Sequence, residues 1–418
     1  MKILILGSGG REHALYAALR KSKSAEQVLV LPGNGGIPES DRIRHITAPY
    51  ANGFKALQEF VQSEQFDLVV VGPEQPLVDG VADALEKTCA VFGPKKAAAQ
   101  IEGSKGWARA FMERHGLPSA RYAEFSDFDA ALAGLDSFGP PYVIKADGLA
   151  AGKGVTVTSD REHAVQALKE ALVEGVFGSS GAKVLLEEFL PGREASVFAI
   201  CDGEKALAFQ PARDYKRVFD NNEGPNTGGM GAVTPVEYVS ETVMQQIQSE
   251  VLDRAVQGFK KDGTPYRGLL YAGLMIHEGK ARLVEFNCRF GDPETQALLL
   301  LLEDDIAQLF FQAATGHLKS SSLRFRNAVG MTVVLAAEGY PGDYKKGIDL
   351  AGLEKDFVDG VQCFHAGTER NGTLRSTGGR IANITGTGVS IEDARNRIYS
   401  QLKSRSIAGT FFRSDIGL

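Results

Sequence analysis

Four short apolar segments shape the first part of the chain, and each of them ends in a loop rich in glycine or proline. The segments are Lys2–Leu6, Val28–Leu31, Asp67–Val71 and Ala90–Phe92. Stretches of helical character lie between them. Strands that alternate with helices in this way predict a parallel, doubly wound α/β domain. We expect this domain to end near residue 100 and to hold its ligands beyond the carboxyl ends of its strands.

The loop after the first segment reads Gly7-Ser8-Gly9-Gly10-Arg11 and opens a helix. Glycines at this place let backbone N–H groups bind an anion at the helix N-terminus. The dinucleotide fingerprint G-x-G-x-x-G is incomplete, because Glu12 stands where its third glycine belongs. The loop after the second segment, Pro32–Gly36, also has no acid to hold a ribose hydroxyl. A nicotinamide site is therefore a weak hypothesis, while a phosphate site and a plain tight turn both stay open.

The composition indicates a soluble globular protein. At 418 residues, the chain has room for about two to four domains of roughly 150 residues each. Its net charge of −6 argues against a general nucleic-acid binder, which is usually basic. Cys89, Cys201, Cys288 and Cys363 lie far apart without metal-ligand spacing, so we expect reduced thiols. With no apolar run of membrane-spanning length and no signal peptide, we expect a cytoplasmic monomer without a membrane partner.

A second glycine-rich loop, Ala146–Val155, follows a strand predicted over Tyr142–Lys145. Its small residues would let it fold over a polyphosphate, while Lys145 and Lys153 supply positive charge. It is not a Walker loop, because Gly154 follows Lys153 where serine or threonine is needed. The alternative is a mobile hairpin tip, since glycine loops are common.

An apolar strand over Lys183–Leu190 ends in the acids Glu187 and Glu188, and a Pro-Gly turn leads on to Glu194. Any edge strand could end in this way. Beside a phosphate loop, however, it could form an adenine-binding hinge, in which backbone groups contact the base and a carboxylate contacts the ribose.

The run Gly224–Ala232 contains too many glycines for a regular element. It could be a surface loop or a backbone cradle close to a small ligand. A long helix from about Val239 to Lys260 and a strand over Gly268–Ile276 are predicted after it.

The stretch Leu283–Thr295 starts as a strand and ends as the beginning of a helix that we expect over Glu294–Leu302. Side chains alternate across a strand. Glu285, Asn287 and Arg289 should therefore share one face, and the apolar Val284, Phe286 and Cys288 the other. Gly291 and Pro293 break the strand, and Asp292 suits the cap of the helix.

The polar face of this stretch offers carboxylate and amide oxygens, which are ligands for a hard cation such as Mg²⁺. Arg289 would hold an anionic group nearby through its planar fork of donors. The alternative is a solvated edge strand, since strands often alternate in this way.

Beyond about residue 320 the sequence predicts a small α+β domain that closes over the site. Strands are expected over Ala328–Ala336, Val361–His365 and Gly379–Ile384, and a helix near Ile391–Lys403. Asn371-Gly372, between the second and the third of these strands, is expected to form a hairpin turn.

The sequence combines paired lysines, a glycine-rich loop, a strand that ends in acids and a Glu-x-Asn strand. Together these features indicate a nucleotide site without a Walker loop. This combination predicts ATP bound through Mg²⁺ and phosphoryl transfer. No arrangement of Ser, His and Asp or of Cys and His suggests a covalent nucleophile.

These motifs carry a resemblance to the ATP-grasp superfamily and, within it, to the glycinamide ribonucleotide synthetases, also called phosphoribosylamine–glycine ligases. The matching runs span nearly the whole chain: GSGGREHAL, PGNGG, VGPEQPLVDG, EGSK, VIKADGLAAGKGV, EEFLPGREAS, GPNTGGMGA, LYAGLM, EFNCRFGDPETQ, GYPGDY, FHAGT and FRSDIG. The resemblance implies a Rossmann-like N-terminal domain over 1–101, an ATP-grasp domain over 102–320 with a lid at about 120–190, and a C-terminal α+β domain over 321–418.

The resemblance also implies an activity. Such enzymes join glycine to 5-phosphoribosylamine through glycyl phosphate, converting ATP to ADP and phosphate in purine biosynthesis. The cofactors would be ATP and Mg²⁺ or Mn²⁺. A different ATP-grasp carboxylate–amine ligase and a non-catalytic nucleotide-binding protein stay open as alternatives.

Residue roles follow from the resemblance by motif. The nucleotide would contact Lys105, Lys145, Gly152, Lys153, Gly154, Glu187, Glu188, Leu190 and Glu194. The metal would be held by Glu285 and Asn287, and the catalytic residues would be Arg289 and Asp292. Glycine and the ribosylamine would contact Gly9, Gly10, Arg11, Asp214, Lys216, Gly228, Gly229 and Gly291.

The sequence departs from the family pattern at two places. Tyr215 stands where many relatives carry histidine, which leaves a role for this side chain open. Many ATP-grasp enzymes place an acid on the strand before the Glu-x-Asn strand, but Tyr271–Ile276 contains none. A further metal ligand is therefore not identified.

Overall fold

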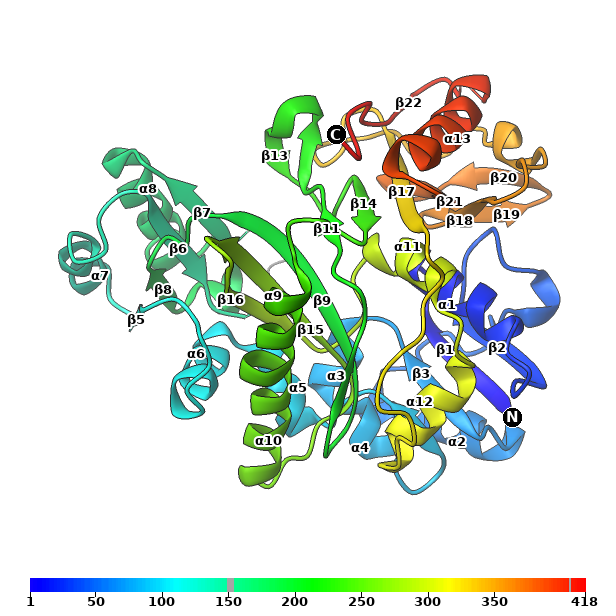
Figure 1. Ribbon diagram of the computed structural model, residues 1–418, viewed down its shortest axis with the longest axis horizontal. Coiled ribbons are helices and arrows are strands. Elements are labelled where there is room, and N and C mark those ends of the chain that lie inside the picture. The colour runs from blue at the N-terminus through cyan, green and yellow to red at the C-terminus, as the bar shows by residue number, and fades with distance from the viewer. Residues whose placement is uncertain (149–153, 406) are drawn as a thin grey trace.

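The computed structural model describes residues 1–148, 154–405 and 407–418 (Figure 1). A parallel sheet forms the N-terminal part, with strand order β2-β1-β3-β4. Its strands are β1 (Lys2–Gly7), β2 (Gln27–Pro32), β3 (Leu68–Val71) and β4 (Ala90–Phe92). Its helices are α1 (Gly10–Arg20), α2 (Lys55–Glu64), α3 (Glu74–Asp79) and α4 (Val81–Leu85). Leu4 and Leu6 enter one apolar core while Ile3 and Ile5 enter another, so the sheet is covered on both faces, as predicted.

The helices α5 (Lys96–Gly103) and α6 (Lys105–Arg114) lead to a lid of four antiparallel strands. The strands are β5 (Tyr122–Phe125), β6 (Tyr142–Ala146), β7 (Val155–Thr158) and β8 (Val184–Glu187), in the order β5-β8-β6-β7. Their apolar side chains form a separate core with α7 (Phe128–Leu135) and α8 (Arg161–Leu172). Figure 1 shows the lid projecting from the rest of the chain, at the far end from the N-terminal strands.

A second antiparallel sheet lies at the centre, in the order β10-β9-β15-β16. Its strands are β9 (Arg193–Asp202), β10 (Ala206–Ala208), β15 (Arg267–His277) and β16 (Lys280–Asn287). The long helix predicted before β15 is present as α9 (Glu241–Gln246), a π-helical segment (Ile247–Asp253) and α10 (Arg254–Lys261). Its apolar side chains pack in one core with those of the central sheet.

The C-terminal sheet has the order β11-β14-β17-β21-β18, and β22 also pairs with β17. Its strands are β11 (Arg213–Asp214), β14 (Gly231–Thr234), β17 (Val329–Ala337), β18 (Val361–His365), β21 (Arg380–Gly388) and β22 (Thr410–Phe411). The helix α13 (Ile391–Ser404) covers it. Gly372, with φ of 74°, makes the predicted turn, but it joins two short strands that were not predicted, β19 (Thr368–Asn371) and β20 (Thr373–Ser376). The sheet therefore takes two strands from the middle of the chain.

The expectation that Gly224–Ala232 forms no regular element is wrong. Residues 223–226 form β13 (Glu223–Asn226), which pairs with β12 (Arg217–Phe219), and residues 231–234 form β14. β14 pairs with β17, about a hundred residues further along the chain. Because the distant partner supplies the hydrogen bonds, local glycine content did not predict the strand.

The helix predicted after β16 begins where expected, as α11 (Glu294–Leu301), and α12 (Ile306–Thr315) follows it. The N-cap of α11 differs from the prediction: Pro293, rather than Asp292, holds this position. The Asp292 carboxylate instead accepts a hydrogen bond from Gln296 Nε2 at 2.7 Å and lies 3.3 Å from Arg380. It is therefore committed to side chains rather than to the helix end.

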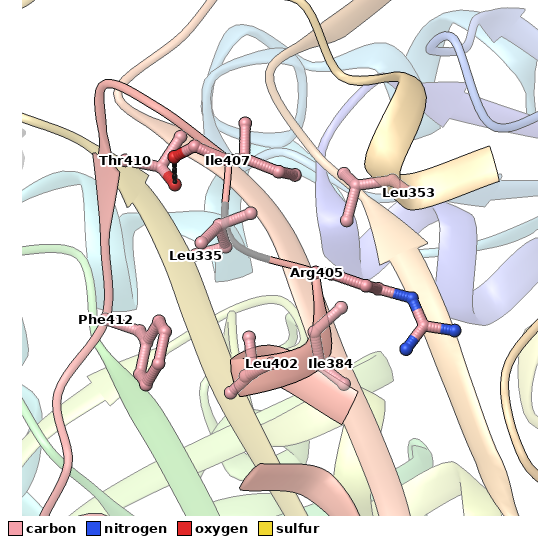
Figure 2. A pocket seen from close by; sticks show the side chains of 8 residues that line it. All are labelled: Leu335, Leu353, Ile384, Leu402, Arg405, Ile407, Thr410 and Phe412. Carbon is pink, nitrogen blue, oxygen red and sulfur yellow. Dashed lines mark hydrogen bonds between the residues drawn. The ribbon is translucent and has the colours of Figure 1, made fainter. Parts of the chain in front are cut away.

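Short 3₁₀ segments complete the secondary structure, at Glu39–Asp41, Asn52–Phe54, Gly178–Gly181, Asp220–Asn222 and Ala351–Glu354. A small cavity of about 70 Å³ lies within the C-terminal domain, against β17, β21 and α13 (Figure 2). Its walls are mainly leucine and isoleucine side chains, so it is part of the apolar core of that domain. No helix in the described ranges combines the length and apolar character needed to cross a membrane.

Candidate active site

One face of the central sheet carries the predicted metal ligands. Glu285 lies directly opposite Gly273, and Asn287 lies opposite Tyr271, in the antiparallel pair β15–β16. Both side chains are half-buried. The structure therefore places Glu285 and Asn287 on the same face, as strand alternation predicted.

The other face of β16 differs from the prediction at Val284. Gly273 pairs with Glu285 and Leu274 with Leu283, so that Val284 forms a β-bulge. The buried residues are Leu283, Phe286 and Cys288, whereas Val284 is half-buried. The bulge shifts the alternation by one residue, which turns Leu283 to the core and Glu285 to the opposite face.

Two lysines predicted to contact phosphates lie near this face. Lys145 is the last residue but one of β6 and is 5% exposed, and its Nζ is 2.8 Å from Glu187 Oε2. Lys105 begins α6, and its Nζ donates to the Gly148 carbonyl at 2.7 Å. Burial lowers the pKa of Lys105, the Glu285 carboxylate opposes that change, and Lys145 adds to it. Lys105 thus lies within electrostatic reach of both Glu285 and Lys145.

Asp147 fixes the beginning of α6. Its Oδ1 accepts hydrogen bonds from the backbone N–H groups of Lys105 at 2.6 Å and Gly106 at 3.2 Å. Ser104 Oγ donates to the same carboxylate at 3.1 Å. A carboxylate at a helix N-terminus is stabilised by the unpaired N–H groups there. The sequence prediction missed Asp147, although it follows directly after the strand that carries Lys145.

The predicted adenine hinge is held by charged side chains. Burial opposes ionisation of Glu187, but Lys145 and Arg109 hold its pKa below the usual range. Glu188 accepts two hydrogen bonds of 2.9 Å from Arg282, which lower its pKa to about 2. Leu190 is buried just beyond these acids.

Two further predicted residues form an ion pair between β9 and the segment that joins β11 to β12. Lys216 Nζ lies 2.9 Å from Glu194 Oε2. Glu194 belongs to β9, whose neighbour Ser196 lies opposite Gly273 in the sheet. The ion pair therefore lies at the same face as Glu285. Gly152 and Lys153 lie outside the described residues, and Gly154 is buried with its carbonyl accepting from Ala146 N at 2.8 Å.

Arg289 lies between two acids that the sequence prediction missed. Its guanidinium is 2.9 Å from Glu102 Oε1 and 3.2 Å from Glu74 Oε2. Burial raises the pKa of Glu102, and Arg289 opposes this. Glu102 Oε2 also accepts from the Cys288 backbone N–H at 2.7 Å. Acids on helices distant in sequence orient Arg289 at the end of β16.

Asp292 and the Gly228-Gly229 turn meet at Arg380, another residue that was missed. Arg380 Nη1 donates to the carbonyls of Gly228 and Asp292, each at 2.6 Å. A Cβ atom at Gly229, where φ is 107°, would lie 2.7 Å from Asp214 Oδ1. The turn therefore requires glycine beside this carboxylate.

The half-buried Asp214 and the buried Glu294 form a pair of acids. Burial and the charge of Glu294 raise the pKa of Asp214. Among the described residues, no donor bonds to the buried Asp214 Oδ1. Glu294 Oε1 accepts from Ser196 Oγ at 3.0 Å. A Cβ atom at Gly291 would come within 2.4 Å of the Glu294 carboxylate, so this glycine cannot be enlarged without movement.

The N-terminal glycine loop is closed by its own helix. Gly9 N donates to Glu12 Oε2 at 2.5 Å, so Glu12 occupies an N–H group predicted to bind phosphate. Arg11 pairs with the same carboxylate and donates to the Phe290 carbonyl at 2.9 Å. A Cβ atom at Gly10 would lie 2.2 Å from Asn383 Nδ2. Gly10 thus packs against the C-terminal domain, while Arg11 contacts the segment next to Arg289.

Tyr215 points away from the site toward the C-terminal segment. It is 4% exposed, and its hydroxyl accepts from Gly417 N at 3.0 Å. The guanidinium groups of Arg213 and Arg413 lie 4.3 Å and 5.3 Å from its ring centroid. The side chain therefore secures the strand that carries Asp214 against the end of the chain.

Sequence models of phosphoribosylglycinamide synthetase match most of the chain. The N-domain model matches residues 1–102, the ATP-grasp (A) domain model residues 103–295 and the C-domain model residues 330–418. The chain belongs to the phosphoribosylglycinamide synthetase family. The resemblance drawn from the sequence motifs is thus confirmed.

A sequence relative and a solved structure both support this family assignment. The chain is 46% identical over 420 residues to a phosphoribosylamine–glycine ligase of Leptospira interrogans, covering 100% of this chain and 98% of that protein. A crystal structure of phosphoribosylamine–glycine ligase from Thermotoga maritima has 34% identity and a TM-score of 0.87, with both chains fully covered.

The fold extends to more distant proteins. The biotin carboxylase domain of 2-oxoglutarate carboxylase from Hydrogenobacter thermophilus, in complex with MgADP, has 17% identity and a TM-score of 0.74. The match covers 98% of this chain and 91% of that biotin carboxylase chain. This likeness confirms the predicted fold class of the phosphoribosylglycinamide synthetase chain, in which an ATP-grasp domain lies between N-terminal and C-terminal domains.

The oxygen donors on β16 suit a hard cation. Glu285 and Asn287 offer a carboxylate and an amide oxygen on one face of the central sheet. Within the described ranges, no group of three or more His, Cys, Asp or Glu side chains could hold a metal. Two protein ligands fit Mg²⁺, which commonly keeps water and takes phosphate oxygens from a nucleotide.

Proposed function

We propose that the chain joins glycine to 5-phosphoribosylamine with conversion of ATP to ADP and phosphate, giving glycinamide ribonucleotide in purine biosynthesis. The observation that carries this proposal is the position of Lys105, which lies within electrostatic reach both of Glu285 on the central sheet and of Lys145. Acidic oxygen donors beside paired lysines suit a polyphosphate that brings its own cation. The family relatives named phosphoribosylamine–glycine ligase support the choice of substrates.

The reaction proceeds in two substitutions. A carboxylate is a poor acylating agent, so an oxygen of the glycine carboxylate first attacks the γ-phosphorus of ATP, and ADP leaves. The amine nitrogen of phosphoribosylamine then attacks the carbonyl carbon of glycyl phosphate, phosphate leaves and the nitrogen loses a proton. Both steps need alignment and charge stabilisation rather than a covalent enzyme group.

The nucleotide lies between the lid and the central sheet in this proposal. Lys105 and Lys145 bind its phosphates, with Gly152, Lys153 and Gly154 over them. Glu187, Glu188 and Leu190 border the adenine, while Glu194 approaches the ribose. Because Glu187 and Glu188 are already paired with cations, base recognition depends on the backbone of the hinge, and the carboxylates keep that backbone in place.

The reacting groups lie at the end of β16. Arg289 binds the carboxylate or acyl phosphate, because Glu74 and Glu102 hold its guanidinium in place. Asp292 and Gly291 border the glycine, and Asp214, Lys216, Gly228 and Gly229 close the acceptor side. Arg11 contacts the phosphate of the ribosylamine, with Gly9 and Gly10 shaping the loop behind it.

A divalent cation, Mg²⁺ or Mn²⁺, is held by Glu285 and Asn287 in this proposal. When bound, it would neutralise negative charge on the phosphates. The missing acid on Tyr271–Ile276 is consistent with nucleotide oxygens and water as its remaining ligands. We place the protein in the cytoplasm as a monomer, and the four free cysteines suit a reducing compartment.

The test is a coupled assay of ADP formation with phosphoribosylamine generated in place. We expect turnover only when ATP, a divalent cation, glycine and the ribosylamine are all present. Other carboxylates offered in place of glycine distinguish a related ligase with different substrates. ADP formation that ignores both glycine and the ribosylamine would contradict the proposal, as would nucleotide binding without any turnover.

A further inference from the structure

Arg109 contacts β8, the strand of the predicted adenine hinge, through the buried carboxylate of Glu187. It lies on α6 and is 2% exposed. Its Nε donates to Glu187 Oε1 at 2.8 Å and its Nη2 to Glu187 Oε2 at 2.5 Å. The guanidinium thus makes a bidentate pair with Glu187. The same carboxylate contacts Lys145 Nζ at 2.8 Å, so Arg109 and Lys145 share one acid.

The guanidinium also contacts β16, the strand that carries the predicted metal ligands. Arg109 Nη2 donates to the Val284 carbonyl at 2.7 Å, and Nη1 approaches the Leu283 carbonyl at 3.5 Å. These are the residues of the β-bulge in β16. From the other side, Leu283 N donates to the Pro118 carbonyl at 2.7 Å, just after α6. Helix α6 therefore anchors the bulge through a side chain and through the backbone that follows it.

The bulge decides which way Glu285 points. In a regular strand, Leu283 and Glu285 would lie on the same face, because they are two residues apart. Leu283 is fully buried in the core, so without the bulge Glu285 would be directed to that core. The inserted Val284 instead places Glu285 opposite Gly273 on the site face. Any group that stabilises the bulge also sets the position of the predicted metal ligand.

We propose that Arg109 is a positioning residue for the nucleotide–metal site: by bonding to both Glu187 and the bulge at Val284, it fixes Glu285 relative to Lys145. This inference rests on the proposed function only in taking Lys145 and Glu285 as the groups that meet the phosphates and their cation. Arg109 itself is committed to Glu187 and the strand carbonyls. Its effect reaches the nucleotide through the residues that it holds.

A lysine cannot replace this arginine. A guanidinium presents a planar fork of donors that contacts Glu187 with two nitrogen atoms and still reaches the strand carbonyls, whereas an ammonium group is a single point. In an Arg109→Lys chain the charge in the core is kept, so folding is disturbed less than in an Arg109→Met chain. The lysine variant therefore separates positioning from the cost of leaving Glu187 without its partner.

The test uses the full chain and two readouts. The chain has one tryptophan, Trp107, which lies on α6 and stacks on Phe111 with 5.4 Å between ring centroids. Its fluorescence measures binding of ADP and Mg²⁺ without any turnover. Steady-state rates then give separate KM values for ATP and for glycine.

For Arg109→Lys we expect the dissociation constant of ADP with Mg²⁺ and the KM for ATP to rise about ten- to hundredfold, as for loss of a group that orients metal ligands. The KM for glycine should stay within about threefold of the parent value. Arg114→Met is the matched control, because Arg114 lies on the same helix with 51% of its side chain exposed. It should change neither constant.

Nucleotide affinity within about twofold of the parent in a folded Arg109→Lys chain would overturn the inference, as would equal changes in the constants for ATP and glycine. If Arg109→Met does not fold, the lysine variant decides the question alone. A parent chain that binds ADP with Mg²⁺ but shows no glycine-dependent turnover would contradict the proposed function instead. The binding readout would still test Arg109 in that case.

Discussion

Gly273 and Glu285 lie directly opposite each other in the pair β15–β16, and a Cβ atom at position 273 would come within 3.1 Å of Glu285 Cγ and 3.2 Å of Tyr271 OH. Because Gly273 has no side chain, the predicted metal ligand Glu285 can lie beside it on the sheet. A substitution here would displace Glu285 without removing any functional group.

Gly273→Ala is expected to lower kcat/KM for ATP about tenfold, since small displacements of reacting groups are costly. Folding should change less, because Glu285 is half-buried and can move. The measurements are ADP formation and thermal unfolding of the same preparation. Parent-like turnover in a folded variant would show that the site tolerates movement of Glu285.

Glu285→Gln keeps the size of the side chain and removes its charge. We expect kcat/KM for ATP to fall about hundredfold or more, because a group that stabilises charge in the transition state is lost. Binding of ADP should also lose its dependence on Mg²⁺, measured by Trp107 fluorescence. Glu278→Gln is the matched control: it lies at the tip of the same hairpin, with 84% of its side chain exposed. Equal behaviour of the two variants would refute the metal role of Glu285.

Tyr215→Phe removes the hydroxyl that accepts from Gly417 N. We expect the free energy of unfolding to fall by about 1–2 kcal/mol, since a partly buried donor loses its partner. The KM for glycine or the ribosylamine should rise more than the KM for ATP, because Asp214 and Lys216 flank Tyr215. Tyr122→Phe is the control, because its hydroxyl makes an exposed 3.5 Å contact with Glu113 Oε2. A parent-like urea midpoint would contradict the structural role of the Tyr215 hydroxyl.

Two buried histidines link the N-terminal and C-terminal domains and predict a pH dependence of stability. The His365 backbone N–H donates to His13 Nδ1 at 2.9 Å. Burial and His365 lower the pKa of His13 to about 3, and burial and Arg370 lower the pKa of His365 to about 4. In the unfolded chain both would titrate near the ordinary pKa of about 6.5.

Between pH 6.5 and pH 4 the unfolded state therefore binds more protons than the folded state. Stability is fully present above pH 6.5 and falls as the pH is lowered, by at most about 1.4 kcal/mol per pH unit for each histidine. Urea unfolding of the parent and of His365→Phe across this range checks the prediction, since the carboxylates titrate in both chains. We expect the variant to have a shallower slope, and identical slopes would contradict the role of His365.

The sequence predicted the parts of the site that depend on local pattern. Glu285 and Asn287 share a face because strand residues alternate, and Lys145 ends a strand that was recognised from its apolar run. The bulge at Val284 could not be predicted, because it depends on the register with β15 and on a side chain from α6. In the sequence alone, Arg109 is one polar residue among others on a predicted amphipathic helix.

The missed residues share one physical property: each acts across a long separation in sequence. Glu74 and Glu102 lie on helices of the first part of the chain, yet they orient Arg289. Arg380 comes from the C-terminal sheet and contacts Asp292. A single charged residue on a helix or strand is usually solvated, and only the packed structure distinguishes these from the rest. At the N-terminal glycine loop the local pattern missed a contact between neighbours in the sequence, because Glu12 accepts a hydrogen bond from the Gly9 N–H group.

The pairing of β14 with β17 sets an order of events during synthesis of the chain on a ribosome. Gly231 pairs with Val333, so the edge of β14 has no partner on this side until residue 333 has left the exit tunnel. An unpaired strand edge is a site of aggregation. β14 is short, which limits that hazard, but β11, which carries Asp214 and pairs with β14, can settle only after the C-terminal sheet has formed. A nascent chain can thus complete its N-terminal sheet early, while catalytic competence arrives only near the end of translation.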